Sequence, residues 1–221
     1  MAAEHRLSRE EKSGPAAMAI KRFNRAAMFA IAGALVVSRL PRRKGGKATI
    51  PDERDLMRLH EAAMRFLVAK PGRWRDYDFH IVDEGQIVFR GAPAAKLPRL
   101  MRRYFRDLEG IWTTGDALDV AAYALWWIAW IHPFDDGNGR ASVAFAYVCF
   151  SLKIGARLPG LEETFDSIIS DRARYRAFIK ASDHARATIA GPSGMPDLWP
   201  LKDYLDGLLA EDLAAAALST G

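Results

Sequence analysis

The feature of the sequence that most constrains its fold is a polar decapeptide, residues 131–140, which lies between two apolar helical patterns. The preceding pattern covers residues 116–131, and the following one covers residues 141–150. Apolar residues at this density predict helices that are buried in a protein core. Because the residue before a proline avoids the helical conformation, we expect the first helix to end at about His132. The segment is therefore predicted to be a helix–loop–helix.

The second half of this loop has the composition of an anion-binding site. Gly137 and Gly139 permit positive φ and let a ligand approach the backbone closely. Residues 137–140 lie at the start of the second helix, where unpaired amides and the helix dipole favour negative charge. Arg140 adds a fork of donors that suits phosphate oxygens.

The first half of the loop supplies a carboxylate and an imidazole. Asp136 beside a phosphate site indicates Mg²⁺, which usually takes one or two carboxylates together with phosphate oxygens. His132 has an ordinary pKa that suits a general base near neutral pH. Asp136 and Arg140 each have a plainer interpretation as well. Asp136 would cap the next helix, and Arg140 would pair with a carboxylate. Asp135 is expected to be solvated.

The loop resembles the signature of a known family. It reads Ile131-His132-Pro133-Phe134-Asp135-Asp136-Gly137-Asn138-Gly139-Arg140. This is similar to the Fic signature, usually written H-P-F-x-[D/E]-G-N-G-R-x-x-R, and it matches through the first arginine. The motif is long and unusual in composition, which makes the resemblance far more specific than a short glycine-rich pattern. The second arginine of the signature is missing, because Val143 stands at that position.

The resemblance implies transfer of a nucleoside monophosphate, commonly AMP from ATP, to a Ser, Thr or Tyr hydroxyl of a target protein. It also implies a role for each matching residue. His132 would be the general base, Asp136 would hold Mg²⁺, and Phe134 would anchor the loop in the core. The phosphates would be bound by Gly137, Asn138, Gly139 and Arg140.

A β-hairpin is predicted upstream of the signature. Two β-favouring runs, residues 79–82 and 86–89, flank a turn that contains Gly85. Fic proteins carry such a flap next to the active-site loop, and it would hold the target segment by strand addition. The flap residues expected to contact the target are Ile81, Val82, Ile87, Val88 and Phe89. Weaker similarity extends the resemblance to about residues 50–185, including Arg172-Ala173-Arg174-Tyr175.

The rest of the chain indicates a single, mainly helical domain. Residues 1–16 are predicted to be a flexible arm, and residues 17–221 a single domain. Helices are expected over residues 17–40, 52–69, 94–109, 162–169, 171–190 and 197–218. With the two helices around the loop, this gives a mainly α, Fic-type bundle of about eight helices with one hairpin. The apolar run 26–37 is too short to span a bilayer and is expected to be a buried helix.

The missing second arginine affects two expectations, the identity of the nucleotide donor and the presence of an inhibitory motif. In the family it helps to bind the γ-phosphate, and it often pairs with an inhibitory glutamate in a [S/T]-x-x-x-E-[G/N] segment. Only Glu53 has a Ser or Thr four residues earlier, Thr49, and Arg54 follows it, so the inhibitory motif is not recognisable. Loss of one charge-assisted phosphate contact costs about 1.5–3 kcal/mol. A donor other than ATP, such as another nucleotide or a CDP-linked head group, becomes more plausible.

Composition limits the compartment and the kinds of partner that are expected. The single cysteine, Cys149, excludes an intramolecular disulfide and indicates a reducing compartment, the cytoplasm by default, although a secreted effector without a readable signal is compatible. The net charge of +5 is mild and spread out, so nucleic-acid binding is a minority hypothesis. Two more hypotheses stay open, namely the same fold transferring a different phosphate-linked group and a catalytically weak binding module. A separate antitoxin or regulator is compatible with the resemblance.

Overall fold

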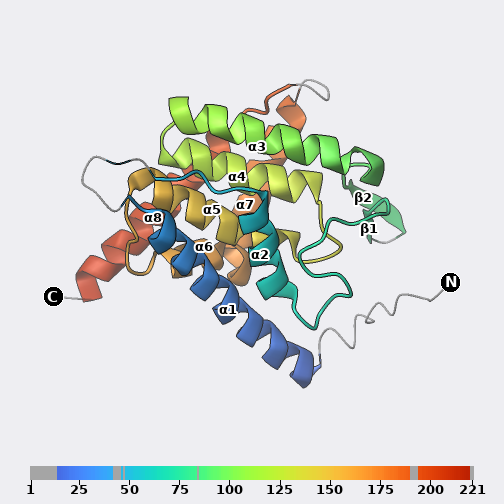
Figure 1. The fold of residues 1–221 in the computed structure, drawn as a ribbon, viewed down its shortest axis with the longest axis horizontal. Coiled ribbons are helices and arrows are strands. Elements are labelled where there is room, and N and C mark those ends of the chain that lie inside the picture. Colours follow the sequence, from blue (N-terminus) through green and yellow to red (C-terminus); the bar gives the residue numbers. More distant parts are fainter. Residues whose placement is uncertain (1–13, 42–45, 47, 84, 190–193, 220–221) are drawn as a thin grey trace.

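The structure is a computed structural model that describes residues 14–41, 46, 48–83, 85–189 and 194–219. These residues form eight α-helices, one short 3₁₀ helix and one antiparallel hairpin (Figure 1). The prediction of a mainly α protein with about eight helices and a hairpin is confirmed. The elements are α1 (Pro15–Arg39), α2 (Glu53–Met64), β1 (His80–Asp83), β2 (Gln86–Arg90), η1 (Ala94–Lys96), α3 (Leu97–Thr114), α4 (Ala117–Ile131), α5 (Asn138–Ile154), α6 (Leu161–Ser170), α7 (Arg172–Thr188) and α8 (Trp199–Ser219).

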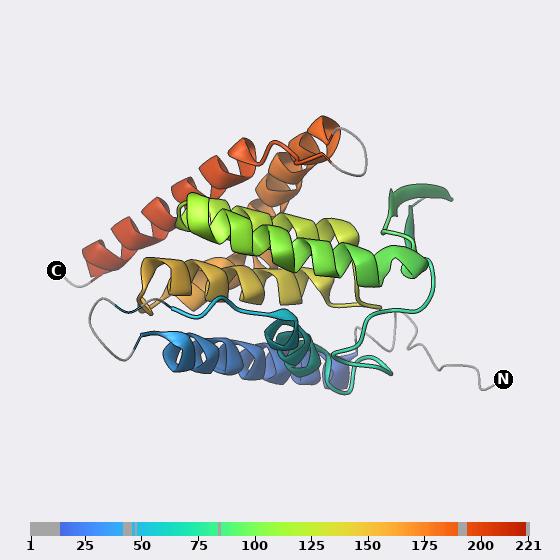
Figure 2. The same cartoon turned by 45° about the horizontal axis from the view of Figure 1, so that its top comes forward.

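Helix α5 lies at the centre of the bundle. It packs against α1, α2, α4 and α6. Figure 2 shows α1 and α2 as a layer on one side of α5, with α4 and α3 on the other side. Every residue of α5 from Ala141 to Leu152 is buried, which explains why its sequence is apolar on all sides rather than on one face. The start of α5, where the signature lies, is therefore held by several elements at once.

Helix α1 is buried on one face only, so the prediction of a buried helix is correct for that face, while Phe23 and Val37 are exposed. Met28, Ala32 and Val36 are fully buried against the core. No helix among the described residues is long and apolar enough to cross a membrane. The helix begins at Pro15, so the last two residues of the expected N-terminal arm are helical, while residues 1–13 of that arm lie outside the described part of the chain.

Helix α2 begins where it was predicted and ends earlier. Asp52 and Asp55 form a capping box at its start. The predicted end at residue 69 is wrong, because the helix stops at Met64. Phe66 has a left-handed backbone with φ of 64°, and the side chain of Asn24 on α1 donates a hydrogen bond to the carbonyl of Arg65. This contact from another helix, which no local pattern reveals, takes up a carbonyl just past the helix end.

The end of α4 was predicted at the right residue but with a different conformation. His132 follows the last residue of α4, and its amide still donates to the carbonyl of Ile128 at 3.0 Å. The preference of pre-proline residues predicts an extended backbone. Instead, His132 has φ of 54° and ψ of 59°, in the left-handed region. The guanidinium of Arg75 accounts for part of this arrangement, because its Nε donates to the carbonyl of His132 at 2.7 Å.

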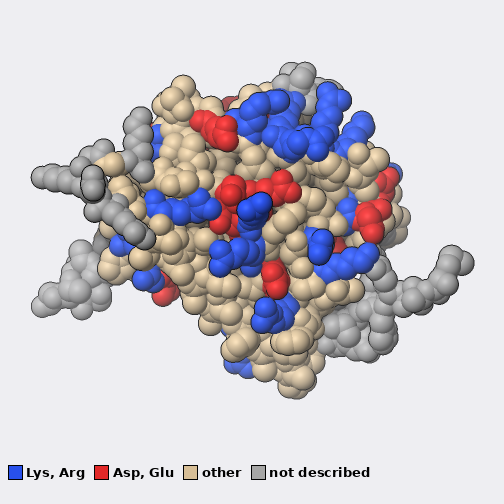
Figure 3. Space-filling model, in the orientation of Figure 1, with Lys and Arg blue, Asp and Glu red and all other residues tan. Residues whose placement is uncertain are grey.

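Charge is mixed on the face seen in Figure 3. Lysines and arginines gather over α3, next to acidic side chains. Within α3, Arg103 and Arg106 both form ion pairs with Asp107. The basic helix is thus partly neutralised by its own acidic residues, which is typical of a solvated surface.

Candidate active site

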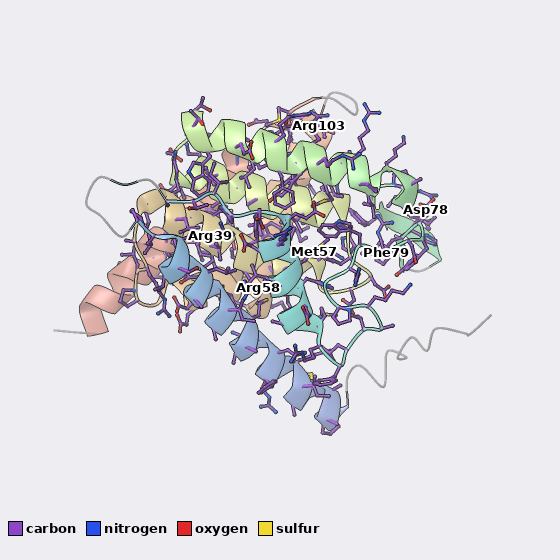
Figure 4. All side chains as sticks on the ribbon, in the orientation of Figure 1. Arg39, Met57, Arg58, Asp78, Phe79 and Arg103 are labelled. Carbon is purple, nitrogen blue, oxygen red and sulfur yellow. The ribbon has the colours of Figure 1, made fainter. Side chains whose placement is uncertain are left out.

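His132 lies between two aromatic rings at the end of α4. Its imidazole stacks on Phe79 with ring centroids 4.6 Å apart and contacts Phe89 at 5.2 Å. Both phenylalanines belong to the hairpin region, and Figure 4 shows Phe79 beside Asp78 at the base of the hairpin. The Nδ1 atom lies 3.2 Å from the carbonyl oxygen of Ala129. Because a carbonyl can only accept, Nδ1 carries the hydrogen in this contact, and the lone pair of the neutral ring is on Nε2.

The surroundings of His132 keep the imidazole neutral. Burial lowers the pKa of His132 from 6.5 to about 4, and the hydrogen bond to Ala129 only partly opposes this shift. The positive charge of Arg75 lowers the pKa further. At pH 7 the ring is therefore unprotonated and able to accept a proton at Nε2.

The loop that follows His132 is closed by Asn138. The side-chain carbonyl of Asn138 accepts from the amide of Phe134 at 2.9 Å, and its amide group donates to the carbonyl of Phe134 at 3.0 Å. Phe134 is fully buried and packs against Trp74 with ring centroids 4.7 Å apart. Phe134 thus lies where a loop anchor was expected. The Asn138 side chain is used inside the loop, so a ligand would meet only its backbone amide.

His60 on α2 supports the same loop and was missed from the sequence. Its ring stacks on Phe134 with centroids 3.7 Å apart and planes within 1°. Its Nε2 lies 2.8 Å from the carbonyl of Asp136, and its Nδ1 accepts from the amide of Gly72 at 2.8 Å. Burial lowers the pKa of His60 to about 4. A lone histidine at helical spacing carries no signal that would have identified this role.

Arg75 is the second supporting residue that the sequence did not reveal. It is 5% exposed, and its guanidinium donates to the carbonyls of His132, Tyr77 and Ala92. It also lies 3.4 Å from the carbonyl of Ile131. Arg75 therefore connects the end of α4 to the segment that leaves the hairpin. Its place after a Pro-Gly break looks like that of an ordinary loop arginine.

The start of α5 has the geometry of an anion site. Gly137 precedes the helix with φ of 77° and ψ of 10°, and its carbonyl accepts from the amide of Ala141. The first amides of the helix, at residues 138–140, have no acceptor within the helix, as in any helix N-terminus. A Cβ at residue 137 would lie closest to the sulfur of Met64 and 2.6 Å from its Cγ atom, so Met64 would have to move to admit any other residue, and the positive φ also favours glycine.

Asp136 and Arg140 lie next to each other at this helix start. The carboxylate of Asp136 accepts from the amide of Gly137 at 2.6 Å and lies 3.8 Å from the guanidinium of Arg140. Arg140 also donates to the carbonyl of Ala63 on α2 at 3.3 Å. Burial lowers the pKa of Arg140, and Asp136 opposes this shift. The plainer interpretation of Arg140, pairing with a carboxylate, thus describes a real contact. The capping interpretation of Asp136 does not hold, because its carboxylate accepts from Gly137, which precedes α5, and no side chain caps the helix.

Asp135 differs from its prediction. It was expected to be solvated, but it is half-buried, and its carboxylate accepts a hydrogen bond from the hydroxyl of Tyr77. Tyr77 lies in the segment just before the hairpin, which folds back over the loop. A sequence separation of 58 residues explains why no local pattern indicated this contact.

His132 and the start of α5 line one cleft of about 750 Å³, whereas the supporting residues His60 and Arg75 do not line it. The loop contributes His132 and all residues from Asp135 to Arg140, and the hairpin contributes Ile81. Helices α1, α6 and α7 provide the other walls, with Tyr175 among them. A second, more apolar pocket of about 390 Å³ shares His132 with this cleft and is lined by Phe89 and Trp130. The histidine therefore stands where a polar cleft and an aromatic pocket meet.

The hairpin is placed as a flap beside this cleft. Strands β1 and β2 pair with an irregular register between Ile81 and Val82. Ile81 is 43% exposed and Ile87 is 41% exposed, so both are available to a partner, whereas Phe89 packs on His132. The side chains of Val82 and Val88, also expected to contact the target, lie outside the described part of the structure.

The residues present fit a magnesium ion that is shared with a ligand. No group of three or more His, Cys, Asp or Glu side chains suited to a metal occurs in the described part of the chain. Asp136 offers one carboxylate, 41% exposed, at the edge of the anion site. This is the arrangement in which Mg²⁺ takes most of its ligands from phosphates and water.

Comparison with known proteins bears on the family and the fold of the chain. Residues 50–150 match the model of the Fic/DOC family. No curated protein shows significant sequence similarity to the chain. Among solved structures, a Fic family protein from Desulfovibrio desulfuricans is similar over 96% of this chain and 68% of its own, with 23% identity and a TM-score of 0.61.

Two further structures extend this comparison. A Fic domain-containing signaling protein from Bacteroides thetaiotaomicron is similar over 91% of this chain and 73% of its own, with 17% identity and a TM-score of 0.64. BepC from Bartonella tribocorum, a VirB-translocated effector protein with bound AMPPNP, covers 94% of both chains with 14% identity and a TM-score of 0.55. Residues 50–150 thus match the Fic/DOC family, and the chain as a whole has the fold of Fic proteins.

Proposed function

We propose that this protein transfers a nucleoside monophosphate, AMP from ATP as the first candidate, to a Ser, Thr or Tyr hydroxyl of a target protein. One observation carries the proposal: a neutral imidazole and a helix N-terminus with an adjacent carboxylate and guanidinium line the same cleft. A general base, an anion site and a place for a divalent cation are the parts that phosphoryl-type transfer requires. The bound AMPPNP in the structurally similar BepC supports a nucleotide as the donor.

The chemistry follows from the positions of the polar atoms. Nε2 of His132 would accept the proton of the target hydroxyl, while Nδ1 remains bonded to the carbonyl of Ala129. The hydroxyl oxygen would form a bond to the α-phosphorus, and the bond from that phosphorus to the bridging oxygen would break. Pyrophosphate would leave with the electron pair. The amides at the start of α5 and the guanidinium of Arg140 would stabilise the charge that develops on the phosphates.

Magnesium would be held by Asp136 together with phosphate oxygens. Bound there, the ion would neutralise charge on the diphosphate. The contacts of Asp136 with the amide of Gly137 and with Arg140 hold its carboxylate at the mouth of the anion site.

The target segment would lie along the hairpin. A two-stranded sheet has a free edge on each side, and an extended peptide can add to such an edge through main-chain hydrogen bonds. Because Phe79 and Phe89 contact the ring of His132, a peptide bound to the hairpin would present its hydroxyl close to Nε2.

The proposal is tested by incubating the protein with Mg²⁺ and a nucleotide labelled at the α-phosphate, with a cell lysate as the source of targets. We expect label on the protein itself or on a lysate protein, no label from γ-labelled ATP, and none after addition of EDTA. The variant His132→Ala should lose the signal, while His184→Ala, which removes an exposed histidine, should retain it. No label from any donor, or unchanged labelling by His132→Ala, would contradict the proposal.

Because Val143 replaces the second signature arginine, more than one nucleotide donor is tested. The position of the second signature arginine is occupied by an apolar side chain that is fully buried, so no charge reaches the cleft from there. The same experiment is therefore run with labelled CTP, GTP and CDP-choline. Label from one of these donors and none from ATP would identify the same chemistry with a different transferred group. Nucleotide binding without any transfer would indicate a binding module.

A further inference from the structure

The cleft has a basic wall that the signature does not provide. Three residues of α1, Lys21, Arg22 and Arg25, line the cleft that contains His132 and the start of α5. In sequence they are only a basic segment before an apolar run. Helix α1 packs against both α2 and α5, and Figures 1 and 2 show it alongside these two helices. A stretch more than a hundred residues away in sequence thus faces the signature loop.

The turn of α1 that bears these residues is fixed relative to the signature by Asn24. This side chain is 1% exposed and donates to the carbonyl of Arg65 at 2.6 Å. It also lies 3.4 Å from the carbonyl of Ala63, which accepts a hydrogen bond from Arg140 at 3.3 Å. The same carbonyl at the end of α2 is therefore contacted from α1 and from the signature arginine. This shared contact holds the basic turn of α1 in register with the anion site.

One of the three basic residues is also oriented by an acidic partner. Arg25 forms an ion pair with Asp166 on α6, whose side chain is buried, and lies 3.5 Å from the hydroxyl of Ser170. Asp166 itself lines the cleft. The pair places a guanidinium at the α6 side of the cleft and partly neutralises it. Lys21 and Arg22 lie about one turn earlier on the same helix, and Arg22 is exposed.

We propose that Lys21, Arg22 and Arg25 of α1 form the subsite for the phosphates beyond the one that is transferred. They would contribute the charge that the second signature arginine does not provide here, because Val143 is buried in the core. This inference rests on the proposed function, since it assigns the leaving diphosphate of the same nucleotide. It predicts that affinity for a nucleotide increases steeply from monophosphate to triphosphate, and that α1 provides much of the increase.

Direct binding measurements test the subsite separately from catalysis. Affinities of AMP, ADP and ATP, each with Mg²⁺, are measured by calorimetry for the wild type, Lys21→Ala/Arg22→Ala and the charge reversal Arg22→Glu. We expect ATP affinity to fall about tenfold or more in both variants, since one charge-assisted phosphate contact is of that order. AMP affinity should change less than about twofold. Arg25 is left intact because its pairing with Asp166 contributes to the fold.

The matched control is Arg58→Glu. Arg58 is exposed on α2, where Figure 4 shows it, and it does not line the cleft. This substitution lowers the net charge by two, as each α1 variant does, so it reports any long-range effect of net charge. Arg58→Glu should bind ATP as the wild type does. Thermal unfolding of each variant verifies that the fold is retained.

The outcomes separate this inference from the proposed function. A selective loss of ATP affinity in the α1 variants supports the subsite even if no hydroxyl is ever labelled, in which case only the transfer proposal fails. An equal loss for AMP and ATP, or no loss beyond that of Arg58→Glu, overturns the subsite even if labelling is observed. A wild-type protein that binds AMP and ATP equally well, or that binds neither, overturns it as well.

Discussion

His132 is the residue on which the proposed chemistry depends, and its surroundings predict an unusual pH dependence. A base acts in its unprotonated form, so activity is lost as pH falls through its pKa. Because burial lowers the pKa of His132 to about 4, we expect the initial rate of transfer at subsaturating nucleotide to be level between pH 7 and pH 5. Below about pH 4 the rate should decrease tenfold per pH unit.

This profile is measured as initial label transfer across the pH range, with circular dichroism at each pH as a control for unfolding. An acid limb with its midpoint near 6.5, the ordinary value for histidine, would contradict the described environment of the ring. Such a result would mean that the ring is more exposed to water in solution than between Phe79 and Phe89.

His60 is expected to matter for stability rather than for chemistry. The substitution His60→Ala removes the stacked contact with Phe134 and leaves the carbonyl of Asp136 and the amide of Gly72 without this partner. Unsatisfied buried groups and a lost ring contact together predict a decrease of about 3 kcal/mol in the free energy of unfolding. Urea unfolding followed by circular dichroism measures this decrease.

The comparison for this prediction is His184→Ala. His184 forms an exposed pair with Asp197, and exposed pairs contribute little to stability. Its loss should change the free energy of unfolding by less than about 0.5 kcal/mol. If the two variants were equally stable, the support that His60 gives to the loop would be refuted.

At the scale of single residues, the sequence predicted which loop residues line the cleft better than which residues hold the loop in place. The residues from His132 to Arg140 are adjacent in the chain, so a local motif was enough to identify them. His60 and Arg75 act on the loop from 57 or more residues away, through carbonyl oxygens. Every residue has such a carbonyl, so no side-chain pattern marks where these contacts will form.

At the scale of elements, the start of α5 depends on a close approach between two helices. The substitution Gly137→Ala would place a Cβ 2.6 Å from the Cγ atom of Met64, at a residue with φ of 77°. We expect this strain to shift the loop away from α2, to lower stability by about 1–3 kcal/mol and to reduce nucleotide affinity. Thermal unfolding and calorimetry with Mg–ATP measure the two effects.

A parallel change at Gly155 is the control for this prediction. Gly155 also has positive φ, 75°, but a Cβ there would meet no atom within 4 Å. Gly155→Ala should therefore cost stability through its backbone conformation alone and leave nucleotide affinity unchanged. Equal effects of the two substitutions on affinity would show that contact with Met64 does not position the loop.

Element boundaries were predictable where the cause was local. Capping residues Asp52 and Asp116 precede α2 and α4, and both form capping boxes. The hairpin followed from two β-favouring runs around a glycine. The early end of α2 at Met64 was not predictable, because it involves a hydrogen bond from Asn24 on another helix. Contacts of this long-range kind also explain where the loop differs from its prediction. Arg75 binds the carbonyl of His132, and Tyr77 binds the carboxylate of Asp135.

At the scale of the whole molecule, the number of helices followed from periodicity, but the position of α1 did not. A basic segment before an apolar run indicates only a helix with one buried face. Its packing on α2 and α5, which brings Lys21, Arg22 and Arg25 to the cleft, depends on how all the helices assemble. The cleft is therefore a property of the assembled bundle, although the polar residues at its centre belong to ten consecutive positions.

Binding of phosphate at the start of α5 can be measured directly. In ¹H–¹⁵N spectra of the labelled protein titrated with Mg–ATP, we expect the largest shifts at the amides of Asn138, Gly139 and Arg140. The indole of Trp199, which is 66% exposed and does not line the cleft, should not move. Shifts concentrated elsewhere, with these three amides unchanged at saturation, would contradict the claim that this helix start holds the phosphates.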